Sequence, residues 1–193
     1  MLPAIEFDMQ KACLFRFFSQ IEDDMTHRIA HLLDANWKAI HLLTEEQTFG
    51  ARVATYKRAL SANPSASFEV ERDREFWRTL EDLRIVRNAF AHGSQFFEQS
   101  ETGLRHVYSR AGPALNGKYE QAIDVEAMPF AVALATHLHL LMQCLVIEDL
   151  TGQSTMLAKV KVDWEQAKSF LPQGRSPKWP PRQPAHVRDE RDA

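Results

Sequence analysis

The chain has 193 residues and a hydrophobic fraction of 45%, which fit one globular domain followed by a tail. Its formal net charge is −3, so it has no overall positive field for nucleic acid, and any contact with RNA must be local. The first ten residues, MLPAIEFDMQ, include acids and no basic segment, so we expect no signal peptide. Two cysteines make no disulfide framework, and both lie among apolar residues. We therefore predict that Cys13 and Cys144 are buried, reduced thiols of a cytoplasmic protein.

The first predicted element is one long helix from about Ala4 to Ala35. Apolar residues recur in it every four positions, from Ile5 to Leu33. Because this repeat drifts around a helix of about 3.6 residues per turn, the buried stripe must wind or the helix must break near Asp23–Asp24. The next segment, Trp37 to Leu43, fits a linker and a continued helix equally well.

Two more helices are predicted in the first half of the chain. Thr44 and Gln47 form a capping-box pattern that would start one helix. Its apolar residues run from Phe49 to Leu60, and it stops before the turn signal Asn63–Pro64. The other runs from about Phe68 to His92, and its outer face carries charges of both signs, which is typical of a solvated helix.

The helical pattern then lapses for some thirty residues. Leu104–Arg110 and Lys118–Val125 are predicted as short strands, and Asn116–Gly117 between them is a hairpin turn signal. The segment from about Met128 to Leu150 is apolar nearly all round, which favours a helix in the middle of the bundle over a membrane span. A last helix starts near Ser154 or Thr155 and ends at Leu171.

These elements predict an all-α protein: a bundle of about five helices with a short β-hairpin insertion. The helical domain spans residues 1–171. From residue 172 to residue 193 the composition changes to Pro, Arg, Gln and acids without periodicity, which is typical of a disordered tail.

Histidines at helical spacing are candidate metal ligands. His27 and His31 are four residues apart, with Asp24 three residues before His27, and this geometry can hold a metal. A polar stripe on an otherwise buried helix explains the same three residues better. His137 and His139 are two residues apart, or about 200° around a helix, so they face opposite ways and at least one is a core or interface histidine. We expect no metal and no other cofactor.

The candidate catalytic residues lie in the stretch from residue 83 to residue 93, LRIVRNAFAHG. Arg87 shares a helical face with apolar residues, so it must either be paired or look into a cleft or an interface. Asn88 and His92 are four apart and lie one above the other on a neighbouring face. Gly93 is expected to end the helix. The pattern predicts a guanidinium, an amide and an imidazole clustered at the C-terminal end of one helix.

This stretch resembles the signature of the HEPN domains, helical proteins many of which are metal-independent ribonucleases. Their motif is Arg, a polar residue that is often Asn, three to five more residues, and His; here it reads Arg87, Asn88, Ala89, Phe90, Ala91, His92. The resemblance implies an RNA substrate and a homodimer in which two copies of the motif face each other across a cleft. Family context suggests a toxin with an antitoxin or other regulatory partner, or an antiphage effector.

The residue types of the motif suit RNA cleavage by the 2′-hydroxyl. Histidine titrates near neutrality and can serve as the base or the acid, while arginine presents a charged fork that matches phosphate oxygens. Two alternatives stay open. In one, the motif is structural: Arg87 pairs with an acid of another helix while Asn88 and His92 cap carbonyls. In the other, the chain is a non-catalytic binding or regulatory protein similar to the mannitol-operon repressor type.

Overall fold

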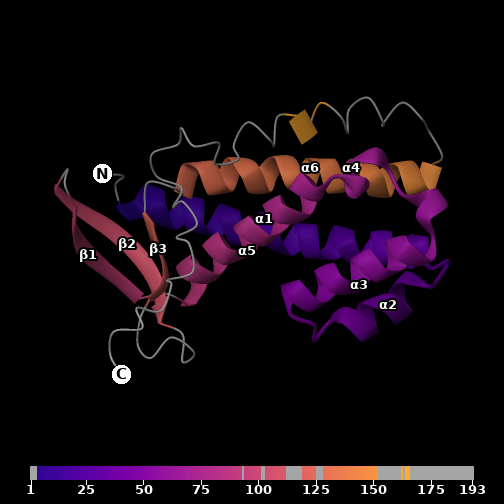
Figure 1. Ribbon diagram of the computed structural model, residues 1–193, viewed down its shortest axis with the longest axis horizontal. Helices are drawn as coiled ribbons and strands as arrows, with labels where there is room; N and C mark the ends of the chain where they lie inside the picture. Colours follow the sequence, from indigo (N-terminus) through magenta and orange to yellow (C-terminus); the bar gives the residue numbers. More distant parts are fainter. Residues whose placement is uncertain are drawn as a thin grey trace, which may run out of the picture.

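The computed structural model describes residues 4–92, 94–100, 103–111, 119–124, 128–151, 162 and 164–165. Within these residues it shows a bundle of α-helices, with a small antiparallel sheet at one end (Figure 1). The predicted all-α bundle is confirmed as the main architecture. The sheet is an addition between the fifth and sixth helices of the described chain.

The bundle is built on α1 (Ala4–Leu32), which packs along α6 (Met128–Thr151) over much of its length (Figure 1). The helix continues unbroken through Asp23–Asp24. Its buried stripe combines steps of four and of three residues, and such a stripe stays on one side of a helix. The members of this stripe are Leu14, Phe18, Ile21, Met25, Ile29 and Leu32.

Cys13 lies just outside that stripe and is exposed, so the prediction that both thiols are buried is wrong for Cys13. The apparent four-residue repeat placed Cys13 and Met9 in the core, yet the side chain of Met9 is also exposed. Cys144 lies on the core side of α6 and is buried, as predicted.

The segment after α1 turns sharply and forms a short helix. Asp34 adopts a positive φ of 48°, a left-handed conformation that Asp tolerates better than most residues. Asn36 then caps α2 (Trp37–Thr44) by accepting a hydrogen bond from the backbone N–H of Lys38 at 2.8 Å. The ambiguous segment is therefore a helix of its own.

The predicted capping box at Thr44 and Gln47 is wrong. Thr44 is the last residue of α2, and its buried hydroxyl donates to the carbonyl of Ile40 at 2.9 Å. The helix that follows, α3 (Phe49–Ala62), is capped by Thr48, whose hydroxyl accepts from the N–H of Ala51 at 3.3 Å. Both threonines fit the residue preference of a cap, and only the backbone decides between them.

The predicted helix from Phe68 to His92 is two helices, α4 (Glu69–Arg72) and α5 (Arg74–His92). Asp73 between them is extended, with φ −75° and ψ 124°. Its carboxylate accepts from the N–H of Glu75 at 2.8 Å, as an N-cap residue does. The break therefore has a local cause in the sequence.

A three-stranded antiparallel sheet follows α5, in the order β1 (Ser94–Ser100), β2 (Gly103–Ala111) and β3 (Tyr119–Asp124). The pairing of β2 with β3 confirms the predicted hairpin. Strand β1 was not predicted. Both β2 and β3 contact α5, which places the sheet beside the C-terminal half of that helix (Figure 1). The turn Asn116–Gly117 and the helix end at Gly93 lie outside the described residues.

Helix α6 has the predicted bounds to within one residue and is a core helix on the side that meets α1. It is also long and apolar enough to cross a membrane by length and composition, and half of that apolar stretch is buried inside the molecule. Of the last predicted helix, only Val162, Trp164 and Glu165 are described, and they are helical. Trp164 is buried against Phe76 and donates to the carboxylate of Asp73. The predicted tail, residues 172–193, lies outside the described residues.

Candidate functional site

Arg87 lies on the side of α5 that faces α1. Its guanidinium carbon is 5.0 Å from the ring centre of Phe18 and 5.9 Å from that of Phe15, both on α1. Its Nη1 donates to the side-chain oxygen of Asn88 at 3.0 Å. The arginine is half-buried, and the two aromatic rings explain how a cation shares a face with core residues.

Glu22, also on α1, is the acid that interacts with Arg87. Burial raises the pKa of the Glu22 carboxyl, while the positive charges of Arg52 and Arg87 oppose that rise. Arg52 in turn is buried and donates to the backbone carbonyls of Glu22 and Thr44. The carboxyl group of Glu22 thus lies in the electrostatic field of two arginines, Arg87 and the structural Arg52.

His92 is the last residue of α5 and is exposed. No described residue donates or accepts a hydrogen bond with its imidazole. Residues five apart lie about 140° around a helix, so Arg87 and His92 point in different directions within one chain. Asn88 links them, because its amide bonds to Arg87 and it lies one turn before His92 on nearly the same face.

The candidate metal ligands Asp24, His27 and His31 each contact a different partner and do not converge on one point. Asp24 lies 3.0 Å from Nδ1 of His139 on α6, and His31 lies 3.3 Å from the carboxylate of Asp149. His27 packs edge-on against Trp37. Among the described residues, no three His, Cys, Asp or Glu side chains are placed to hold a metal ion.

A buried charged cluster, absent from the sequence predictions, surrounds Arg28 of α1. The side chain of Arg28 is fully buried and pairs with both carboxylate oxygens of Glu71, at 2.7 and 2.8 Å. Its Nη1 donates to Asp149 at 2.5 Å and its Nη2 to the carbonyl of Ala66 at 2.6 Å. The hydroxyl of Tyr56 donates to Glu71 as well. Helices α1, α3, α4 and α6 therefore meet at one guanidinium.

One sequence signal could have pointed to this cluster. Arg28 lies between the core residues Met25 and Ile29, seven residues after the buried Ile21 and thus on the same face of α1, where a charge requires a partner. Its partners lie 43 and 121 residues away in the chain, so the sequence alone does not name them.

No known protein family, curated protein or solved structure matches this chain. The fold and the candidate site therefore define its class: an α-helical bundle with an Arg-Asn-x-x-x-His motif at the end of α5, beside a three-stranded sheet.

Proposed function

We propose that the protein is a metal-independent endoribonuclease of the HEPN type that acts as a homodimer. The observation that carries the proposal is the accessibility of the motif: His92 is exposed, and Arg87 is held in place by an amide and two aromatic rings. The proposed setting is the cytoplasm, where the protein would act as a toxin restrained by an antitoxin, or as an antiphage effector.

The polar atoms of the motif leave room for a phosphate. A guanidinium has five N–H donors, and the described residues engage one of them, through Asn88. The side-chain N–H groups of Asn88 are also donors, since its oxygen is the atom that Arg87 contacts. Arg87 and Asn88 can thus donate together to the oxygens of one phosphodiester.

The proposed reaction needs no metal. His92 takes the proton of the RNA 2′-hydroxyl, whose oxygen attacks the adjacent phosphorus, and the bond from phosphorus to the 5′-oxygen breaks. His92 of a second copy gives the departing 5′-oxygen its proton, while Arg87 stabilises the negative charge on the phosphate. The products are a 2′,3′-cyclic phosphate and a 5′-hydroxyl. Because each chain supplies one motif histidine, His92, the proposed reaction needs a dimer.

A second function, that of a non-catalytic binding or regulatory protein, is favoured by one electrostatic interaction. Glu22 interacts electrostatically with Arg87, and a partly neutralised arginine suits a non-catalytic binding or regulatory protein better than a phosphate clamp. On that alternative the same surface binds a partner, and no RNA is cleaved.

Purified protein incubated with mixed RNA in EDTA separates the two functions. We expect cleavage, and a loss of at least about 100-fold in His92→Ala and Arg87→Ala, because each removes a group that acts in the transition state. Arg87→Lys should also be poor, since an ammonium lacks the bidentate fork. Asn88→Ala should lose less, about 10-fold, because it removes neutral hydrogen bonds.

The matched controls are Arg84→Ala, one turn earlier on α5, and His41→Ala on α2, which should both retain activity. RNA with hydrogen in place of the 2′-hydroxyl at the cleaved position should resist. Cleavage that persists in His92→Ala and Arg87→Ala, or that requires a divalent metal, contradicts the proposal. If wild-type protein and His92→Ala are equally harmless when expressed and neither degrades RNA, the binding function is the better conclusion.

A further inference from the structure

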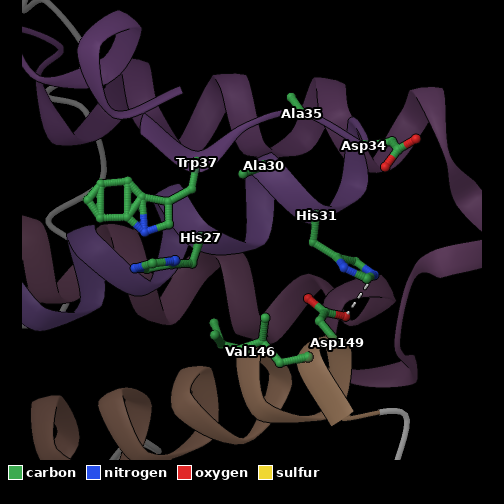
Figure 2. A pocket seen from close by; sticks show the side chains of 9 residues that line it. His27, Ala30, His31, Asp34, Ala35, Trp37, Val146 and Asp149 are labelled. Atoms are coloured by element: carbon green, nitrogen blue, oxygen red, sulfur yellow. Dashed lines mark ion pairs between the residues drawn. The ribbon is translucent and has the colours of Figure 1, made fainter. Parts of the chain in front are cut away.

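A pocket of about 280 Å³ lies at the opposite end of α1 from the motif, where α1, α2 and α6 meet (Figure 2). The left-handed turn at Asp34 brings Trp37 over the end of α1 and so forms one wall. His27 and His31 of α1 project into the pocket, and Asp149 of α6 lies opposite them (Figure 2).

Asp149 carries an unused acceptor beside this pocket. Its side chain is only 5% exposed. Its Oδ1 accepts from Arg28 and lies 3.3 Å from the imidazole of His31, whereas its Oδ2 is buried and accepts no hydrogen bond. A buried carboxylate oxygen without a donor is costly. Because Asp149 also lines the pocket, a small movement of its carboxylate that brings Oδ2 to a ligand donor would relieve this cost.

Around the pocket, carboxylates outnumber lysine and arginine side chains among the described residues. The buried cluster holds one cation, Arg28, and two carboxylates, Glu71 and Asp149. Burial and the nearby Glu71 carboxylate raise the pKa of Asp149, while the charges of Arg28 and His31 oppose the rise. The other charged residue of the lining, Asp34, is also an acid, and no described lysine or arginine lines the pocket.

The remaining lining suits an apolar or aromatic body. Trp37 is 42% exposed, and its ring meets that of His27 edge-on at 5.0 Å between centres. Leu150, on the last turn of α6, is 77% exposed at the rim. Trp37 and Asp149 thus lie at different sides of the pocket, which suits a ligand with an apolar body at one end and an ammonium group at the other (Figure 2).

We propose that this pocket binds a small organic amine, with its ammonium group donating to Asp149 and its apolar body against Trp37 and Leu150. The volume limits the ligand to a compact molecule. The proposal concerns a site separate from the motif on α5 and does not depend on the proposed ribonuclease activity.

The test is calorimetric titration of the full-length protein with 2-phenylethylamine, and with 2-phenylethanol and 3-phenylpropionate as neutral and anionic probes of similar shape. We expect the amine to bind with a Kd of about 1 mM or tighter and at least about tenfold better than either control. Equal binding of the amine and the alcohol, or no binding of the amine, overturns the proposal.

Two variants locate the site. Trp37→Ala changes a half-exposed side chain and should weaken amine binding at least about fivefold, whereas Leu42→Ala, an exposed residue of α2 outside the lining, should not. Asp149→Asn keeps an oxygen for Arg28 but removes the charge, so it should abolish the preference for amine over alcohol. Unchanged binding in Trp37→Ala overturns the proposal even if Asp149→Asn does not fold.

Discussion

At the scale of single residues, the buried Arg28 connects α1 with α4 and α6 through its charged contacts. Burying a guanidinium costs several kcal/mol, and the cost is offset only where charged partners and hydrogen bonds satisfy it. Glu71 supplies a two-point contact, Asp149 a third bond and Ala66 a carbonyl, while the ring of Phe68 lies 4.7 Å from the guanidinium carbon. Burial and the neighbouring Glu71 carboxylate also raise the pKa of Tyr56, so its hydroxyl stays a proton donor.

Arg28→Ala should therefore lower the free energy of unfolding by about 3–5 kcal/mol, because Glu71 and Asp149 would remain buried without their cation. Urea unfolding followed by circular dichroism measures this directly. Arg84→Ala is the matched control, since Arg84 pairs with Glu81 at a partly exposed position three residues away. It should change the free energy of unfolding by at most about 1 kcal/mol. Equal midpoints for the two variants would show that the cluster contributes little.

At the scale of elements, the pairing of α1 with α6 includes one polar contact in an apolar seam. Asp24 of α1 meets Nδ1 of His139 of α6 at 3.0 Å, and the ring of Phe17 lies 5.8 Å from that imidazole. Burial raises the pKa of Asp24 from its usual 3.8 to about 6, and the hydrogen bond and charge of His139 oppose the rise. The carboxyl is thus costly to ionise in the folded protein.

This shift predicts a pH dependence of stability. Between about pH 4 and pH 6 the folded state binds more protons at Asp24 than the unfolded state, so the free energy of unfolding falls as the pH rises through 6. Asp24→Asn should remove up to about 2 kcal/mol of the difference in unfolding free energy between pH 4.5 and pH 7, which urea unfolding at the two pH values would measure. Asp8, an exposed residue near the other end of α1, should leave the dependence intact when it is changed to Asn. A slope that survives in Asp24→Asn would assign it to other groups.

At the scale of the whole molecule, the proposed mechanism needs two copies of the motif. Arg87 and His92 point in different directions on α5, and the proposed mechanism uses two histidines. We expect the protein to sediment as a dimer, at twice the 22.2 kDa mass of one chain, at micromolar concentration. Monomer alone under those conditions, together with RNA cleavage, would require a mechanism with a single motif.

The sequence predicts the parts of this fold that depend on local composition and spacing. The extent of α1, the long apolar run of α6 and the segments β2 and β3 are of this kind, although the four-residue repeat of α1 wrongly placed Cys13 and Met9 in the core. It mispredicts the start of α3, because Thr44 and Thr48 are both acceptable caps, and it runs α4 into α5, because Asp73 also fits a solvated helix face. Strand β1 is stabilised by pairing with β2, a contact between segments that no local pattern records.

Some features of the candidate site can likewise be predicted from the sequence, and others cannot. Arg87, Asn88 and His92 follow from residue type and spacing. That Arg87 lies over Phe18 and near Glu22 depends on how α5 crosses α1, which is set by packing across the whole bundle. The pocket beside Trp37 likewise depends on the turn at Asp34, and its carboxylate comes from α6.

The long sequence separation between Arg28 and its partners has a consequence for synthesis on the ribosome. Arg28 is translated early, Glu71 follows 43 residues later, and Asp149 is 121 residues further along the chain than Arg28. Until α6 emerges from the ribosome, Arg28 lacks its second carboxylate partner, Asp149, and α1 lacks the apolar surface of α6 that covers it. The bundle closes only after α6 has been synthesised, and during that interval α1 exposes apolar surface that attracts chaperones or aggregates.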